Sequence, residues 1–237
     1  MADILLRPNT VACRNALKLK QLLMSTFTHP VLLVVGGGAI GSGIDALYSD
    51  PGLDIVAFDI YGTPAVQLIA DGHQIPLRSG SVDAVVVQAV LEHVLEPAVV
   101  VSEIHRVLKK DGIVYAETPF MQPVHAGPYD FTRFTESGHR YLFKRFDRID
   151  SGVVLGPGAS LLWNLEYAAR GLFRSRAIGK VVKAAFFWLQ YLDRFVPEGH
   201  SIDTASGVYF LGRKSDHEIP PHGMVEYYRG AEPQGRS

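Results

Sequence analysis

A run of glycines marks the part of the sequence that is best suited to bind a cofactor. Gly36, Gly37, Gly38 and Gly41 form a G-x-G-x-x-G pattern directly after an apolar segment. Glycines permit a tight turn and a close approach of the backbone to a ligand, and a helix after such a turn offers free N–H groups. Asp59 comes 18 positions after Gly41 and can accept hydrogen bonds from ribose hydroxyls. The pattern predicts a site for an adenosine-containing cofactor, either NAD or S-adenosylmethionine.

A histidine and its neighbours in the segment 118–135 could supply acid–base chemistry. His125 can act as a general base because histidine titrates near neutral pH, and Asp130 can orient its ring. Tyr129 and Arg133 are candidate substrate contacts. The alternative is that His125 and Asp130 only brace this loop, with Arg133 paired to Asp130.

Three other histidines have less obvious roles. His93 is a second candidate base or substrate contact, although Glu92 and His93 could instead pack against the cofactor loop. His105 lies among charged residues and is expected to be solvated or paired along a helix, and His139 is expected to be structural. No spacing of histidine, cysteine and carboxylate residues matches a zinc motif, so no metal site is predicted.

Alternating strands and helices are expected to bring these residues together. The expected strands are 31–35, 54–58, 82–87, 113–116, 146–155 and 208–212, with a short one just after 73–76. The expected helices are 11–27, 44–48, 65–70, 97–108 and 133–143. Such alternation predicts right-handed βαβ units and a mostly parallel sheet with helices on both faces. Parallel α/β sheets bind ligands beyond the carboxyl ends of their strands, where the glycine turn and the His125 loop both lie.

Composition narrows the class of protein. Of the 237 residues, 47% are hydrophobic, which suits a globular core. The net charge of −1 gives no global basic field, so nucleic acid is not expected as a partner. Cys13 is the single cysteine and cannot form an internal disulfide, the N-terminus shows no signal-peptide pattern, and no apolar run reaches the length of a membrane span. These observations predict a cytoplasmic protein.

Residues 31–119 resemble the class I S-adenosylmethionine-dependent methyltransferases, and in particular the type 11-like methyltransferases. The resemblance rests on an ordered series of motifs, DGHQIPLRSGSVDAVVVQAVLEHV followed by EIHRVLKKDGIVYAETP. It favours S-adenosylmethionine over NAD as the cofactor. It also implies a Rossmann-like α/β fold with seven strands, six of them parallel and the last one antiparallel, and the segment 208–212 can fill the last place.

The resemblance implies a role for each matching position. The residues that would hold the cofactor are Gly36, Gly37 and Gly38 at the methionine moiety, Asp59 at the ribose, Ile60 beside the adenine, Asp71 with Gly72 or His73 at the adenine edge, and Gln88 near the methionine part. Two positions depart from the family pattern. Val34 stands where the family often has an acidic residue, and Gly41 lies one position after the expected third glycine. The methionine end is therefore expected to use other groups, or a turn one residue longer.

The resemblance implies methyl transfer to an oxygen or nitrogen of a small molecule, and analogy with relatives points to a sugar or a lipid-linked glycan. Two alternatives remain open. One is an NAD-dependent oxidoreductase, and the other is a cofactor-binding module without catalysis.

The chain is expected to divide into four parts. These are an N-terminal helix (1–30), a methyltransferase core (31–158 and 198–215), a helical insert (159–197) and an irregular tail (216–237). The insert is apolar and carries six basic and two acidic residues. It could cap the substrate pocket, rest on an anionic membrane as a peripheral contact, or pack on the core or on a second subunit of a homodimer.

Overall fold

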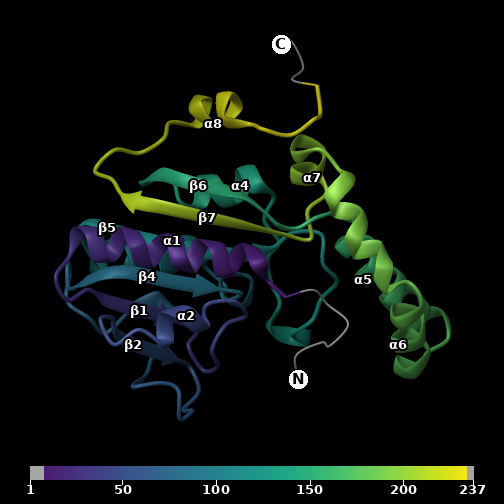
Figure 1. The fold of residues 1–237 in the computed structure, drawn as a ribbon, viewed down its shortest axis with the longest axis horizontal. Helices are drawn as coiled ribbons and strands as arrows, with labels where there is room; N and C mark the ends of the chain where they lie inside the picture. The colour runs from purple at the N-terminus through teal and green to yellow at the C-terminus, as the bar shows by residue number, and fades with distance from the viewer. Residues whose placement is uncertain (1–7, 234–237) are drawn as a thin grey trace.

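The chain folds into a seven-stranded sheet with helices on both faces, in a computed structural model that describes residues 8–233 (Figure 1). The strands are β1 (Val31–Val35), β2 (Asp54–Asp59), β3 (Leu68–Ile69), β4 (Val82–Gln88), β5 (Leu108–Pro119), β6 (Phe146–Leu155) and β7 (Gly207–Lys214). Their order is β3-β2-β1-β4-β5-β7-β6, and β7 runs antiparallel to both its neighbours. The other adjacent strands pair in parallel. The predicted α/β fold and its antiparallel last strand are confirmed.

Two hydrophobic cores form because successive side chains of a strand point to opposite faces. Leu32 and Val34 of β1 belong to one core, and Leu33 and Val35 belong to the other. The first core is covered by α1 (Thr10–Thr26) and α2 (Asp45–Tyr48), and the second by α3 (Pro97–Val107) and α4 (Glu136–Leu142). Val34, which replaces the family's acidic residue, is buried in the first core. It is a packing residue and does not face the glycine turn's ligand side.

A helical segment lies between β6 and β7, as predicted. It consists of α5 (Pro157–Leu172), α6 (Arg176–Ala185), the 3-10 segment η4 (Phe187–Phe195) and α7 (Glu198–Asp203). We call residues 157–195 the helical arm, because α5 and α6 extend away from the sheet in Figure 1. Within the arm, Lys183 is buried 3.2 Å from a carboxylate oxygen of Glu166 and 5.1 Å from the Trp163 ring centroid. The division of the chain into four parts stays a prediction, and its ends, 1–7 and 234–237, lie outside the described residues.

Two short elements differ from the sequence-based predictions. The segment 65–70 was expected to be a helix, but Leu68 and Ile69 form β3 at the edge of β2. The Gln67 N–H donates to the Ala57 carbonyl (2.9 Å) and the Gln67 side chain accepts from the Ala57 N–H (2.7 Å), so this segment takes its hydrogen bonds from the neighbouring strand. The strand expected just after 73–76 is absent from the described residues, where the 3-10 turn η1 (Gly72–Gln74) follows β3 instead. The segment 65–70 has only six residues, which are too few for hydrophobic periodicity to distinguish a helix from an edge strand.

The end of the chain is more ordered than predicted. The helix α8 (Pro221–Tyr227) lies within the tail that was expected to be irregular, and it begins at a proline, which suits the first helical position. The Tyr227 hydroxyl is 2.8 Å from the Ser151 hydroxyl and donates to Glu136. Tyr227 thus ties this helix to β6 and α4.

Two further observations concern burial. None of the helices within residues 8–233 combines the length and the hydropathy that crossing a bilayer requires. His105 was expected to be solvated or paired along its helix, but it is buried, and its Nε2 lies 3.0 Å from the carbonyl oxygen of Ser215. Burial lowers the pKa of His105, so this histidine is a neutral core residue that ties α3 to the chain after β7.

His139 of α4 makes the stability of the fold depend on pH. Burial lowers the pKa of His139 to about 3, whereas an unfolded histidine titrates near 6.5. Between these values the unfolded chain binds more protons than the folded chain, so the free energy of unfolding must fall as the pH drops. This histidine alone should cost about 2 kcal/mol of unfolding free energy between pH 7 and pH 5.

We expect His139→Phe to remove that part of the acid sensitivity, because the ring contacts with Phe134 and Phe143 are kept while the titrating group is lost. Denaturant unfolding at pH 7 and pH 5 measures the effect, with His29→Gln at an exposed position as the control for losing one histidine. An equal loss of unfolding free energy in the parent and in His139→Phe would show that His139 is not the sensitive group.

Candidate active site

A cavity of about 390 Å³ opens where β1, β2 and β4 end. Val35 closes β1, Asp59 closes β2, and Ala89 and Val90 follow β4, and all four line the cavity. A wider hollow of about 660 Å³ lies between α1 and β6, at the opposite end of the sheet from β2 and β3, and takes none of its lining from the glycine turn. The smaller cavity therefore lies beyond the carboxyl ends of the strands, where parallel α/β sheets bind their ligands.

The glycine turn and Asp59 are joined directly. Gly36 has a φ of +71°, which favours glycine, and the Gly37 N–H donates to the carbonyl of Phe58 (2.9 Å). The Gly38 N–H donates to Asp59 Oδ2 at 3.0 Å, and a Cβ on Gly38 would lie 2.7 Å from that oxygen. The turn needs glycine at this point because the strand that carries Asp59 comes so close.

The helix expected at 44–48 after the glycines is present as α2, which begins at Asp45 and has four residues. A Cβ on Gly41 would overlap Oε1 of Gln88, so the chain from Gly36 to Gly41 lies against the end of β4. The alternative of a turn one residue longer than the family pattern stays a prediction.

Asp71 and His73 form a closed pair at the far side of the cavity. Asp71 accepts from the His73 N–H (2.9 Å), and its Oδ1 lies 2.6 Å from His73 Nδ1. The Glu96 N–H donates to His73 Nε2 at 3.3 Å, which places the ring proton on Nδ1. The hydrogen bond from the His73 backbone lowers the pKa of Asp71. Asp71 and Gly72 line the cavity, while the ring of His73 is occupied by its two neighbours.

Gln88 connects the glycine turn to a buried carboxylate. Its Nε2 donates to Ser42 O (3.0 Å) and to Glu117 Oε2 (2.8 Å), and Glu117 also accepts from Asn9 Nδ2 (2.9 Å) and from the Tyr115 hydroxyl. Burial raises the pKa of Glu117. Oε1 of Gln88 is buried and has no hydrogen-bond partner among the described residues. An acceptor without a donor is thus left beside the glycine turn.

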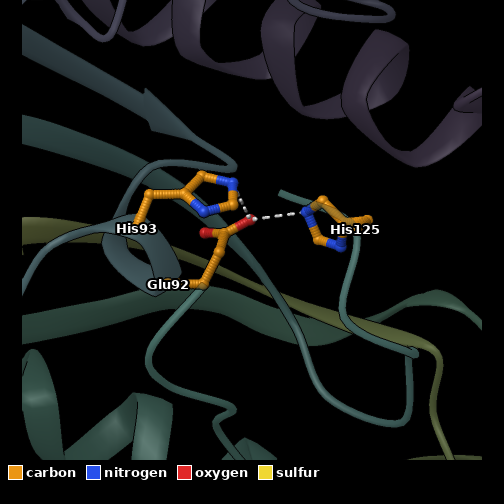
Figure 2. A group of neighbouring side chains, drawn as sticks. All are labelled: Glu92, His93 and His125. Carbon is orange, nitrogen blue, oxygen red and sulfur yellow. Dashed lines mark ion pairs between the residues drawn. The ribbon is translucent and has the colours of Figure 1, made fainter. Parts of the chain in front are cut away.

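Glu92, His93 and His125 form a compact group at the rim of the cavity, which we call the Glu92 cluster (Figure 2). Glu92 and His93 belong to the 3-10 turn η2 (Leu91–His93), and His125 comes from the loop after β5. Glu92 Oε1 lies 3.6 Å from His93 Nε2 and 3.8 Å from His125 Nε2. Glu92 is 0% exposed, and burial raises its pKa to about 7. His93 also lines the cavity, so the cluster and the cavity share a wall.

The loop between β5 and α4 is held in place by Arg133. Its guanidinium donates to both oxygens of Asp130 and to the carbonyls of Gln122, Pro123 and Thr132. All five guanidinium N–H groups are therefore engaged. The hydrogen bonds from Arg133 hold the pKa of Asp130 well below its usual range. This geometry matches the bracing alternative for Asp130 and Arg133.

The pair of Asp130 and Arg133 also positions His125. The His125 backbone N–H donates to Asp130 Oδ2 at 2.9 Å, while its ring Nδ1 lies 3.6 Å from that oxygen, which is too long for a hydrogen bond. Burial lowers the pKa of His125, so the ring is neutral at pH 7. Asp130 thus sets the position of His125 mainly through its backbone.

The structure gathers part of the predicted site around the cavity. The predicted residues that line it are Gly36, Asp59, Ile60, Asp71, Gly72, His93 and Tyr129. Those that stand behind or beside this lining are Gly37, Gly38, His73, Gln88, His125, Asp130 and Arg133. The sequence analysis missed Glu117 and assigned Glu92 only to packing. Both could have been noticed as carboxylates at the ends of strongly apolar segments, where an unpaired charge is costly.

Comparisons with known proteins agree with this geometry. Residues 35–116 match the methyltransferase domain family. The match covers about a third of the chain and favours S-adenosylmethionine over NAD as the cofactor. Solved structures of the same fold were determined with S-adenosylhomocysteine or S-adenosylmethionine bound. A search of curated proteins found no match.

Solved structures show the same fold at low sequence identity. The 1,6-didemethyltoxoflavin-N1-methyltransferase of Burkholderia thailandensis is 16% identical, with a TM-score of 0.52 over 86% of this chain and 79% of that chain. The Haloferax volcanii protein bound to the Trm112 methyltransferase activator is 17% identical, with a TM-score of 0.57 over 90% of this chain and 92% of that one. Coclaurine N-methyltransferase is 12% identical, with a TM-score of 0.51 over 90% and 74%.

Proposed function

We propose that this methyltransferase methylates an oxygen or nitrogen atom of a small molecule that binds beside the Glu92 cluster. The observation that carries the proposal is the position of His93, which lines the cofactor cavity and also belongs to the cluster. An acceptor held against this wall would meet titratable groups next to the cofactor. Solved structures of the same fold are named for small nitrogen acceptors, which supports a small molecule as the acceptor.

Different residues around the cavity would contact different parts of the cofactor. Asp59 would accept hydrogen bonds from the ribose hydroxyls, with Ile60 beside the adenine. Asp71 and Gly72 would lie at the adenine edge, and His73 would hold Asp71 in place. Gly36, Gly37 and Gly38 would give room to the methionine part. Oε1 of Gln88 would accept from its ammonium group, because this buried oxygen has no donor among the described residues.

Methyl transfer is an in-line displacement in which the S–CH₃ bond of the cofactor breaks as the new O–CH₃ or N–CH₃ bond forms. The protein contributes chiefly by holding the two reactants in line. The acceptor also loses a proton, and the imidazoles of His125 and His93 are suited to receive it. We assign Asp130 and Arg133 to positioning His125, and Tyr129, which is exposed at the cavity, to the acceptor side.

The acceptor class can be tested by its product. We expect the protein to release S-adenosylhomocysteine with at least one acceptor from a panel of amines, phenols, alcohols and sugars. With that acceptor, His125→Ala should lower kcat by roughly 10²–10⁴-fold, the range for losing a general base, and leave binding of S-adenosylhomocysteine unchanged. His29→Ala, at the amino end of β1, is the control. Binding of S-adenosylhomocysteine without transfer to any acceptor would favour a cofactor-binding module instead.

The helical arm presents a surface suited to an anionic membrane. Exposed aromatic and aliphatic side chains gather on it, namely Leu172, Phe173, Val181, Phe186, Phe187, Trp188, Tyr191 and Phe195. Exposed basic residues stand among them, including Arg176 and Lys180 on α6. Apolar rings beside basic groups are typical of helices that lie in the membrane interface. We infer a peripheral membrane contact here, which would suit a lipid-linked glycan as the acceptor.

Flotation with vesicles tests the arm. We expect the protein to float with vesicles that contain anionic lipid, and Arg176→Glu with Lys180→Glu to abolish flotation because the charge attraction is reversed. The matched control is Arg78→Glu with Lys110→Glu, which changes the net charge equally at exposed positions off the arm. No flotation at low salt, together with a dimer in light scattering, would assign the arm to a second subunit.

A further inference from the structure

The Glu92 cluster has the features of a metal site. Three potential ligand atoms, one from each residue, lie within 4.8 Å of one another. Glu92 is fully buried, and neither of its carboxylate oxygens has a hydrogen-bond partner among the described residues. A buried carboxylate without hydrogen bonds is costly unless a cation compensates it. We propose that Glu92, His93 and His125 bind a divalent transition-metal ion at the rim of the cofactor cavity.

The spacing inside the cluster is wrong for direct hydrogen bonds and suited to a bridging ion. Glu92 Oε1 is 3.6 Å from His93 Nε2 and 3.8 Å from His125 Nε2, and contacts of this length are not hydrogen bonds. Two ligands bound 2.0–2.1 Å from a tetrahedral ion are about 3.4 Å apart. These two separations exceed that value by a few tenths of an ångström, and all three ligand atoms lie within 4.8 Å of one another. An inward movement of the side chains would complete the site.

The position of the ring proton on His93 also supports a metal ion in the cluster. Its Nδ1 lies 2.7 Å from the carbonyl oxygen of Tyr129, which can only accept, so Nδ1 carries a proton. In the neutral ring Nε2 then presents a lone pair, and Figure 2 shows this nitrogen turned toward the carboxylate of Glu92. A lone pair facing a carboxylate is repulsive unless a cation lies between them. Metal-binding histidines are commonly held in this way, with the other ring nitrogen donating to a carbonyl.

His125 has a carboxylate behind its ring, 3.6 Å from Nδ1 and thus beyond hydrogen-bond distance. Its Nδ1 faces Asp130, which Arg133 keeps anionic, and its Nε2 faces Glu92. The backbone of Glu92 is fixed to the same loop, because its carbonyl accepts from the N–H groups of Phe131 (2.8 Å) and Thr132 (3.3 Å). Arg133 and Asp130 offset each other's charge. With neutral imidazoles and an ionised Glu92, the cluster carries one uncompensated negative charge, which a divalent ion would reverse.

The ligand set indicates the kind of ion. Two imidazoles and one carboxylate suit zinc, iron(II) or manganese(II), whereas calcium and magnesium prefer all-oxygen sites. Three protein ligands leave at least one coordination position open, which is the pattern of a catalytic rather than a structural site. The open position would lie beside His93, on the side of the cofactor cavity.

The use of that open position rests on the proposed methyl transfer. With the ion bound, His93 and His125 would use their lone pairs as ligands and would no longer act as bases. An acceptor hydroxyl bound to the ion would instead have a lowered pKa and would release its proton to water. The resulting oxygen could attack the methyl group, so that the O–CH₃ bond forms and the S–CH₃ bond breaks. A metal in the cluster would therefore select an alcohol or phenol over an amine as the acceptor.

Metal binding can be measured without any acceptor. Protein freed of metal with a chelator is titrated with Zn²⁺ by calorimetry and with Co²⁺ by visible absorption, which reports the coordination of that ion. We expect one ion per chain. Glu92→Gln and His125→Ala should each weaken Zn²⁺ binding at least about tenfold, since even residues behind the ligands have effects of that size. His29→Ala, an exposed histidine outside the cluster and the cavity, should bind as the parent does.

Two controls keep the outcome decisive. Circular dichroism shows whether buried Glu92→Gln folds, and His125→Ala, which changes a loop residue, tests the site if it does not. Binding of S-adenosylhomocysteine is measured on the same samples. Intact cofactor binding without any uptake of Zn²⁺ or Co²⁺, or uptake that the His125 variant leaves unchanged, would overturn the metal site and leave the proposed methyl transfer standing.

Discussion

The position of β1 between β2 and β4 is the constraint on which the rest of the structure depends. The chain leaves β1 toward β2 on one side and returns to β4 on the other, so the carboxyl ends of these strands part around an opening. The glycine turn follows β1, Asp59 ends β2, and Ala89 follows β4 with a φ of +54°. Strained backbone at a non-glycine residue persists where the surroundings fix it, and it gathers at functional sites. The cavity is therefore a product of the strand order.

The second determinant is the brace formed by Arg133 and Asp130. The long segment from β5 to α4 has little regular structure of its own, yet it must bring His125 across to Glu92. Arg133 satisfies several loop carbonyls at once, and the Glu92 carbonyl accepts the N–H groups of Phe131 and Thr132. The brace explains how a loop residue and a buried carboxylate meet although they are distant in the sequence.

Sequence patterns predicted most of the sheet because apolar strands are recognisable as runs of hydrophobic residues. The buried strands β1 and β4 lie where they were expected, and so do the edge strand β6 and the antiparallel β7. Prediction was wrong at β3, whose two residues are defined by hydrogen bonds to β2 rather than by periodicity. It was also wrong for His105, because the chain after β7 that buries this residue is distant in sequence.

The site was only partly predictable for the same reason. Motif spacing indicated Gly36, Asp59 and Asp71, since each stands next to a strand end that the pattern defines. The role of Glu92 could not be deduced from spacing, because its partner His125 lies 33 positions away and the two meet only through the folded loop. The link from Gln88 to buried Glu117 depends likewise on the pairing of β4 with β5.

The central claim is that the opening at β1, β2 and β4 holds the adenosine part of the cofactor. The most direct measurement is calorimetric titration of S-adenosylhomocysteine into the parent, into Asp59→Asn and into Asp54→Asn, an exposed carboxylate at the other end of β2. Loss of hydrogen bonds to a charged group should weaken binding to Asp59→Asn by roughly tenfold or more, and Asp54→Asn should bind as the parent does. Equal affinity in all three proteins would contradict the account.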